Sequence, residues 1–586
     1  MSQSIRQRLA ALRGEMARRS IDAYIIPTTD FHGSEYVNDY FKCREWMSGF
    51  TGSAGTLAVT PDKAGLWTDG RYFLQAEAQL KGSGIMLMKM GQPGVPDIEE
   101  WLDAEIPKGG TVGFDGRVID ARFGEKLRKR FNLKYDEDLV GIIWQDRPGL
   151  HGNKIREIPD SVTGETSARK LARLRKAMEE KKAGRHLITG LEEIAWLYNL
   201  RGSDVKYTPV FYAFALIGRQ EEKIYALDTE GAASCLENRK YEEGMIKPEI
   251  LPYFRIFEDI KKLNGERVLL DENRVSWALL RSLPRDAAII SAPDPVEMMK
   301  AIKNRAEIKS SEQAHIKDGI AMVNFIYWLK TNVGALDLTE ISAARKLEYF
   351  RRSQKGCFDL SFETISGYME NGAIIHYAPS AATDKKLEPE GLLLVDSGGQ
   401  YDDGTTDITR TISLGPLSDE MKEDYTAVLK ANLSLSMAKF RRGTTGSELD
   451  EIARQPLRSR GLDFDHGTGH GVGHILSVHE GPNRISKNGG ECPILPGMIT
   501  TDEPGVYKEG KYGIRLENEL LCTEGDMLGF RPLTMCPFDR EAILPEMLTA
   551  GERSYLNSYH AEVFRTLSPY LDSETAGWLK EQTEEI

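Results

Sequence analysis

Five residues between positions 396 and 517 carry side chains that bind divalent cations. They are two aspartates, one histidine and two glutamates: Asp396, Asp407, His470, Glu503 and Glu517. Four carboxylates and one imidazole are ligands for hard or borderline divalent ions, and they argue against a zinc site built from thiolates. Two adjacent ions bridged by carboxylates would activate a water molecule. The five residues therefore predict a dinuclear centre for hydrolysis.

Each of these residues stands in a sequence context where the backbone can turn. Asp396 and Asp407 are separated by a glycine-rich stretch, so a hairpin can fold both carboxylates onto one site. Glu503 precedes a Pro-Gly pair and is expected at the end of a strand. Glu517 alternates with charged residues in GIRLENE, which predicts one ion-binding face of a strand. Taken singly, the aspartates fit turn residues equally well, and each glutamate fits a surface residue better.

A cluster of histidines surrounds the third candidate ligand. Four of the ten histidines fall within HGTGHGVGHILSVHE, at positions 466, 470, 474 and 479. The alternating glycines exclude a regular helix and let the backbone approach a bound ion or peptide closely. The cluster favours a binding site over core packing, although His474 receives no role.

The segments that must position these residues have the periodicities of helices and strands. Helices are predicted over 297–330, 336–353 and 417–440, the last with Ser418 as its N-cap. Strands are predicted in FETISGYME, IIHYAP, GLLLVDSGG, ITRTISL, GMITTDEPGVY and GIRLENELLCT. Helices that pair with a largely antiparallel sheet predict an α+β domain.

An internal repeat defines the N-terminal half. RLAALRGEMARRSIDAYII at 8–26 recurs as KLARLRKAMEEKKAGRHLI at 170–188. Each copy reads as a basic amphipathic helix and a short apolar strand, so duplicated α/β domains explain the repeat better than chance. The arginines of the first copy also resemble a transit peptide. The repeat favours the alternative, a helix that stays on the mature protein.

These patterns predict a multidomain α+β / α/β chain, because 586 residues exceed what one hydrophobic core organises. Pro-containing polar stretches around 146–165 and 291–296 mark two boundaries. The predicted parts are two α/β domains, an α+β domain with the candidate ligands and a helical C-terminal extension, at 1–155, 156–298, 299–525 and 526–586.

Composition limits the partners. The net charge of -13 argues against nucleic acid as the main partner. No apolar run approaches the roughly 20 residues that span a bilayer, so we expect no membrane partner. Six scattered cysteines without a CxxC pair predict reduced thiols. We expect a cytoplasmic protein.

Long motifs resemble those of the pita-bread metallohydrolases, the superfamily of aminopeptidase P, prolidase and methionine aminopeptidase. VDSGGQYDDGTTDITRT, HGTGHGVGHILSVHEGP and DEPGVYKEGKYGIRLEN resemble its catalytic domain. EYVNDYFKCREWMSGFTGSAGTLAVT and LEEIAWLYNLRGSD resemble the two creatinase-like domains that precede it in three-domain Xaa-Pro aminopeptidases of peptidase family M24. The resemblance covers nearly the whole chain.

The resemblance implies a metal-dependent aminopeptidase that removes the residue ahead of a proline in the second position. It implies two divalent ions, usually manganese, with Asp396 on one, Asp407 and Glu517 bridging, and His470 with Glu503 on the other. A bridging hydroxide would attack the carbonyl of the first residue. Glu503 would move a proton to the departing proline nitrogen.

Further residues are implied around the substrate. His376 and His479 are expected to stabilise the oxyanion, with His466 as a neighbouring third candidate. Arg71 is expected to contact substrate from the first domain, across the interface of a homodimer. The alternatives are a strand histidine at His376 and an exposed strand-end arginine at Arg71. A pocket for proline is selective because the proline nitrogen carries no hydrogen and its φ is fixed.

Two competing functions remain open. A prolidase would cleave only Xaa-Pro dipeptides, but the repeated N-terminal domains and the C-terminal extension argue against it. A non-enzymatic binding protein would keep the fold without the chemistry, as creatinase-like relatives keep it without the metal set. The five intact candidate ligands argue against that second alternative.

Overall fold

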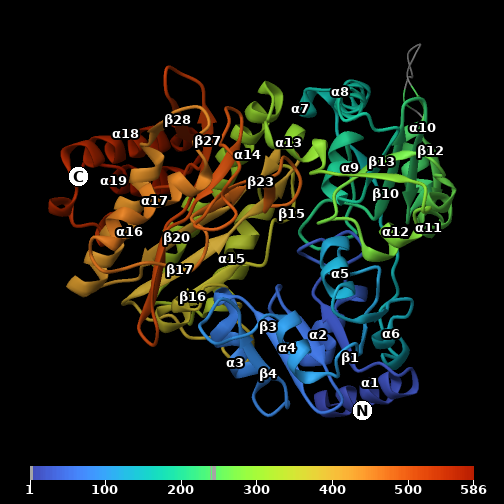
Figure 1. The fold of residues 1–586 in the computed structure, drawn as a ribbon. Coiled ribbons are helices and arrows are strands. Elements are labelled where there is room, and N and C mark those ends of the chain that lie inside the picture. The colour runs from blue at the N-terminus through green and yellow to red at the C-terminus, as the bar shows by residue number, and fades with distance from the viewer. Residues whose placement is uncertain (1–3, 238, 240–245) are drawn as a thin grey trace. The chain divides into compact units, whose positions relative to one another are not determined.

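The computed structural model describes residues 4–237, 239 and 246–586. The chain divides into two compact units, Met1–Asp160 with Glu165–Glu297, and Ser161–Gly164 with Met298–Ile586. In Figure 1 the first unit runs from blue to green and the second from green to red. Among the described residues, no helix is long and apolar enough to cross a membrane. The six cysteines are free.

The first unit contains two six-stranded sheets of the same topology, β4-β3-β2-β1-β5-β6 and β12-β11-β10-β8-β13-β14. In each sheet the inner strand, β1 or β8, pairs antiparallel with one neighbour and parallel with the other. The predicted duplication of α/β domains is therefore confirmed. The strands are β1 (Ala23–Pro27), β2 (Thr56–Val59), β3 (Ala64–Thr68), β4 (Met86–Lys89), β5 (Thr111–Gly113), β6 (Asn132–Lys134), β8 (Arg185–Ile188), β10 (Ala213–Gly218), β11 (Glu222–Ala226), β12 (Glu249–Pro252), β13 (Arg267–Leu270) and β14 (Ala288–Ser291).

The repeated helices are α1 (Ile5–Arg18) and α8 (Ser167–Glu180). Their buried apolar residues fall at matching positions, Leu9, Leu12 and Met16 in α1 and Leu171, Leu174 and Met178 in α8. One apolar face of each helix thus packs into a domain core. The remaining helices of this unit are α2 (Cys43–Ser48), α3 (Phe73–Leu80), α4 (Ile98–Glu105), α5 (Ala121–Arg128), α6 (Leu139–Ile143), α9 (Leu191–Leu197), α10 (Thr229–Glu237), α11 (Ile256–Asp259) and α12 (Trp277–Ser282).

The second unit is built on antiparallel strand pairs, and the predicted α+β class is confirmed. Its sheets have the orders β15-β18-β19, β16-β17-β20, β21-β28-β27-β24-β22-β23 and β25-β26. The strands are β15 (Cys357–Leu360), β16 (Ile365–Tyr368), β17 (Leu392–Ser397), β18 (Gly399–Tyr401), β19 (Gly404–Thr405), β20 (Ile408–Ser413), β21 (Lys439–Phe440), β22 (Gly469–Gly471), β23 (Glu480–Ile485), β24 (Ile499–Asp502), β25 (Gly505–Lys508), β26 (Tyr512–Arg515), β27 (Asn518–Thr523) and β28 (Leu528–Pro532).

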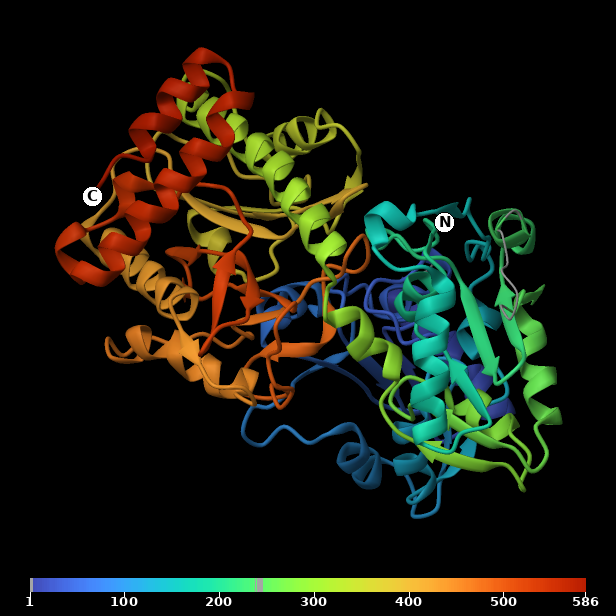
Figure 2. The same cartoon turned by 90° about the horizontal axis from the view of Figure 1, so that it is seen from above.

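Helices cover these sheets (Figures 1 and 2). The two C-terminal helices, α18 (Ala550–Leu567) and α19 (Ser573–Gln582), pack on the long helix α14 (Arg305–Asn332). The helix predicted over 297–330 is two helices, because Asn304 caps a new start with its side chain on the amides of Ala306 and Glu307. Ser418 is the N-cap of α16, as predicted. The helices are α13 (Pro295–Ala301), α14 (Arg305–Asn332), α15 (Glu340–Arg352), α16 (Asp419–Ser436), α17 (Gly446–Arg458), α18 (Ala550–Leu567) and α19 (Ser573–Gln582).

Three strand predictions near the candidate site are wrong. GMITTDEPGVY forms two strands in different sheets, β24 before Glu503 and β25 after Pro504. IIHYAP forms no strand, because the chain there leaves a 3-10 helix, Met369–Ala373, and continues as turns around His376. GIRLENELLCT is not one strand either. The chain changes sheet at Glu517, since β26 pairs with β25 whereas β27 pairs with β24 and β28.

Candidate metal centre

The five candidate ligands lie on strands of the second unit or directly beside their ends. Asp396 lies on β17 and stands opposite Thr409 of β20, while Asp407 directly precedes β20. The short hairpin of β18 and β19 connects the two aspartates. His470 is on β22, and Glu503 directly follows β24. Glu517 occupies the crossing between β26 and β27, where its side chain can leave the plane of both sheets.

These residues meet in three overlapping groups, within each of which the candidate ligand atoms lie within 4.8 Å of one another. The groups are Asp396 with Asp407 and Glu517, His470 with Glu503 and Glu517, and Asp407 with His470 and His479. His470 Nε2 lies 3.5 Å from Asp407 Oδ2 and 3.7 Å from Glu503 Oε1. Asp407, Glu517 and His470 each belong to two of these groups. Of the three, only the two carboxylates carry a second oxygen with which one side chain could reach two ions.

The imidazole of His470 presents a lone pair to this cluster. Its Nδ1 lies 2.9 Å from the carbonyl of Gly471, and since a carbonyl only accepts, Nδ1 carries the proton. Nε2 faces the carboxylates of Asp407 and Glu503, and in the neutral ring it offers a lone pair to a metal ion. The flanking glycines let the backbone of β22 lie close to the neighbouring chain segments. A Cβ at Gly469 would stand 1.9 Å from the Thr501 carbonyl oxygen, and one at Gly471 would stand 2.2 Å from that of Glu480.

The donor set fits a pair of divalent cations. Asp396 Oδ1 and Glu517 Oε1 are buried and accept no hydrogen bond. Their second oxygens accept from Arg515 and from the Thr409 hydroxyl (2.8 Å). Four carboxylates thus share one site with a single guanidinium, and buried like charges are costly without a cation.

The pKa values of the two central acids report the same crowding. Burial raises the pKa of Asp407 well above its usual value, and the charges of Asp396 and Glu503 raise it further. Burial likewise raises the pKa of Glu517, and the charges of Asp407 and Asp396 add to that effect. A bound cation would reverse these shifts, because it stabilises the ionised carboxylates.

A second layer of residues orients the candidate ligands. Arg515 donates to Asp396 through Nη2 (2.5 Å) and Nε (3.2 Å), and through Nη2 also to the Ile375 carbonyl (3.3 Å). The backbone N–H of Asp407 donates to Glu519 Oε1 (2.7 Å). Glu519 Oε2 lies 3.2 Å from Nε2 of the buried His315. Such partners fix the direction in which each ligand points.

Sequence reasoning assigned no role to Arg515 or His315. The signal for Arg515 was its place two residues before Glu517 in the charged alternation of GIRLENE. No local signal marks His315, because it sits in the middle of the long helix α14 and meets Glu519 only through the tertiary fold.

The predicted histidines occupy different positions around the cluster. The ring of His479 stands at 86° to that of His470, with centroids 4.4 Å apart. His376 is half-buried and directly follows Ile375, whose carbonyl Arg515 contacts. Both ring nitrogens of His466 contact protein atoms, Nδ1 the Gly467 carbonyl and Nε2 the Tyr507 hydroxyl, each at 2.7 Å.

Arg71 belongs to the other unit, where it lies in a 3-10 turn at Gly70–Tyr72. Its Nε and Nη2 each donate to one carboxylate oxygen of Asp69 at 2.8 Å. The guanidinium is therefore held by its own domain, and a contact with substrate stays a prediction.

Family models match the chain in the order that the resemblance implies. Residues 309–524 match metallopeptidase family M24, and 526–586 match the C-terminal region of peptidase M24. Residues 8–148 and 146–307 each match a creatinase/prolidase N-terminal domain.

Full-length relatives are also found. The chain is 41% identical to a probable Xaa-Pro aminopeptidase P of Pyricularia oryzae, over 99% of each chain. Among solved structures, the X-prolyl aminopeptidase of Caenorhabditis elegans is 33% identical over 100% of both chains, with a TM-score of 0.93, and is described as a cytosolic enzyme with a di-nuclear active site. A Xaa-Pro dipeptidase of Bacillus anthracis is 26% identical with a TM-score of 0.52, and matches 65% of this chain and 100% of its own.

Proposed function

This chain belongs to metallopeptidase family M24, and we propose that it is an aminopeptidase that hydrolyses the bond between the first residue of a peptide and a proline in the second position. One observation supports this most strongly. In the described part of the chain, the buried acids Asp396, Asp407 and Glu517 converge beside the guanidinium of Arg515, and Asp396 Oδ1 and Glu517 Oε1 accept no hydrogen bond. Full-length similarity to proteins named Xaa-Pro aminopeptidase supports the choice of substrate.

In this proposal the five residues hold two divalent ions, for which manganese is our first choice. Asp396 would hold one ion, His470 and Glu503 would hold the other, and Asp407 and Glu517 would contribute to both. When bound, the two ions supply Lewis acidity that makes a shared water a nucleophile near neutral pH. The His470 ring suits its role because its Nε2 lone pair already faces Asp407 and Glu503.

The chain's own residues then handle the protons and the developing charge. Glu503, with its side chain 19% exposed, takes the proton of the attacking water and delivers it to the departing proline nitrogen. His479 and His376 donate hydrogen bonds to the carbonyl oxygen as it gains negative charge. The right angle between the rings of His479 and His470 leaves the two imidazoles aimed in different directions.

The remaining parts of the proposal concern selectivity and context. Arg71 contacts the substrate from the first domain of the partner in a homodimer, and the four predicted domain ranges describe the chain's organisation. His466 belongs to the substrate-binding surroundings, although its ring nitrogens contact the protein. We also propose a cytosolic location, which the description of the Caenorhabditis elegans relative supports.

A single assay tests this function against its two alternatives. Arg-Pro-Pro and a Xaa-Pro dipeptide are incubated with the manganese-loaded protein, with and without chelator. We expect release of the first residue from the tripeptide only, and loss of that release on chelation. Cleavage confined to the dipeptide would establish a prolidase. The Xaa-Pro dipeptidase of Bacillus anthracis, which matches 65% of this chain, is the solved structure relevant to that alternative. Inactivity of protein that carries two metal ions would favour a binding protein.

A further inference from the structure

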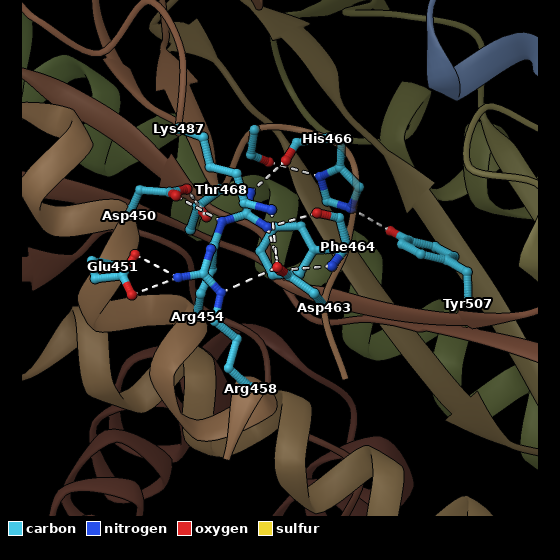
Figure 3. Close-up of polar contacts among 11 residues, drawn as sticks. Asp450, Glu451, Arg454, Arg458, Asp463, Phe464, His466, Thr468, Lys487 and Tyr507 are labelled. Atoms are coloured by element: carbon cyan, nitrogen blue, oxygen red, sulfur yellow. Dashed lines mark hydrogen bonds and ion pairs between the residues drawn. The ribbon is translucent and has the colours of Figure 1, made fainter. Parts of the chain in front are cut away.

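A buried arginine outside the candidate ligands organises the loop that precedes His470. Arg454 lies on α17, and its side chain is 1% exposed. Its Nε donates to Asp450 Oδ2 (2.7 Å), and its Nη1 donates to Asp463 Oδ1 (2.6 Å). Figure 3 shows this guanidinium among the residues of α17 and of the segment 463–468. The segment is therefore tied to the helix through one side chain.

Two backbone carbonyls of the same segment complete the contacts of Arg454. Nη1 also donates to the carbonyl of Phe464 (2.6 Å), and Nη2 donates to that of His466 (2.7 Å). The guanidinium carbon stacks on the Phe464 ring, 3.8 Å from its centroid. A planar fork can donate in these directions while it stacks, whereas a lysine ammonium cannot.

The segment held in this way fixes the orientation of the His466 ring. Nδ1 carries the proton, because its partner is the Gly467 carbonyl. Nε2 therefore accepts from the Tyr507 hydroxyl. The oxygen of Tyr507 accepts in turn from Arg515 Nη1 (2.8 Å), and Arg515 donates to Asp396. A continuous chain of hydrogen bonds runs from His466 to a candidate metal ligand.

We propose that Arg454 is a positioning residue for His466 and acts on the metal centre through the hydrogen-bond chain that ends at Asp396. Arg454 itself contacts the segment's carbonyls and two carboxylates, Asp450 and Asp463, and none of the five candidate ligands. The kinetic test of this proposal rests on the proposed function, whereas the exchange test below does not.

A double-mutant cycle measures the coupling. The variants are Arg454→Lys, His466→Gln and the two combined, and kcat/KM for Arg-Pro-Pro is measured on manganese-loaded protein. Arg454→Lys keeps a positive charge beside Asp450, so the carboxylate of Asp450 is not left without a cation. We expect a loss of about 10–100-fold from Arg454→Lys alone, the usual effect of a residue that orients a metal ligand. In the His466→Gln background the same change should cost less than about threefold.

Two further variants separate positioning from general destabilisation. Arg458→Gln, on the same helix, loses contacts only to the side chains of Asp463 and Glu451 and should leave kcat/KM unchanged. Phe464→Leu removes the ring that stacks on Arg454 and lies 4.8 Å from the His466 ring, and it leaves no charge unpaired. It should lower kcat/KM in the same direction and lose its effect in the His466→Gln background. Additive losses in both cycles would overturn the proposal.

Hydrogen exchange provides a readout that needs no activity. Backbone amides of 463–468 are followed by mass spectrometry in the full chain. We expect exchange about tenfold faster in Arg454→Lys and unchanged exchange in Arg458→Gln, because only the first variant loses the carbonyl contacts. Unchanged exchange in Arg454→Lys would overturn the proposal. If the metal-loaded wild-type protein cleaves no Xaa-Pro peptide, the proposed function fails, and exchange alone decides whether Arg454 holds the segment.

Discussion

Two buried clusters of charge in the second unit are built in opposite ways. At the candidate metal centre, Asp396, Asp407 and Glu517 crowd together with one guanidinium. At the start of β23, Glu480 is 1% exposed and lies between the ammonium groups of Lys300 (3.0 Å) and Lys303. In the first cluster acids lie beside other acids, whereas in the second an acid lies between two lysines.

The pKa shifts in the two clusters have opposite signs. Burial would raise the pKa of Glu480, but the charges of Lys300 and Lys303 outweigh burial and lower it. At Asp407, burial and neighbouring acids both raise the pKa. The ionised form of an acid buried beside lysines is stabilised by the protein itself, whereas an acid buried beside other acids takes up a proton or a cation from solution. This difference distinguishes a structural cluster from a site that binds a cation.

The largest expected effect comes from neutralising an acid of the metal centre. Asp407→Asn should lower kcat/KM by more than about a thousandfold, since it removes a proposed metal ligand and several kcal/mol of transition-state stabilisation. The metal-free variant should unfold at a higher urea concentration than the metal-free wild type, because one buried acid no longer repels the others. Activity assays and urea unfolding in chelator measure the two effects. Lower stability of the metal-free variant would show that favourable contacts of the Asp407 carboxylate outweigh its repulsion by the other acids, and would break the comparison.

The same change in the lysine-paired cluster should have the opposite effect on stability. Glu480→Gln leaves two ammonium groups buried against a neutral partner, which costs about 3–5 kcal/mol of unfolding free energy. Urea unfolding measures it. Glu348→Gln is the control, because its pair with Arg352 is 36–45% exposed and should change stability by less than about 1 kcal/mol. A loss below about 1 kcal/mol for Glu480→Gln would mean that the two lysines do not depend on this carboxylate.

The same contrast explains what the sequence could predict. The candidate ligands were found because glycine and proline neighbours mark them locally, as in HGTGH and TDEPGVY. The duplicated domains were found because a helical period repeats. Arg454 and His315 have no such glycine or proline signal directly beside them in the sequence, because the folded chain alone brings them next to their partners. IIHYAP was predicted as a strand, but the preceding 3-10 helix at Met369–Ala373 directs the chain into turns.

A third kind of buried group extends the comparison. It is a histidine whose pKa is set by burial and by two arginines and not by an acid, and its ring is neutral. His560 is fully buried, and its Nε2 accepts from the Phe538 N–H (3.2 Å). Burial, with the charges of Arg410 and Arg540, lowers the pKa of His560 to about 3. Between that value and the ordinary pKa of about 6.5, the unfolded chain binds more protons than the folded one. Stability from this group is therefore full above about pH 6.5 and is lost as the pH falls.

The pH prediction is tested with His560→Gln, whose amide oxygen can still accept from Phe538. Wild-type protein should lose about 2 kcal/mol more unfolding free energy than the variant between pH 7 and pH 5, at about 1.4 kcal/mol for each pKa unit. Urea unfolding at the two values measures the difference, and all other titrating groups cancel between the proteins. Equal losses would show that His560 is protonated in the folded state.

The smallest effect on activity is expected from a change at His474. This residue lies among the candidate histidines in the sequence, but its side chain contacts the β18–β19 hairpin. It is 2% exposed, and its Nε2 lies 3.0 Å from the carbonyl of Asp403 at the tip of the β18–β19 hairpin. His474→Ala should change kcat/KM by less than about threefold and lower the unfolding free energy by about 1–3 kcal/mol, through a lost hydrogen bond and a small cavity. His474→Gln, which can still donate to that carbonyl, should recover part of the stability. A residue that only supports the hairpin can lower activity only by destabilising the fold. A severe loss of activity with normal stability would therefore place His474 in the acid-rich centre.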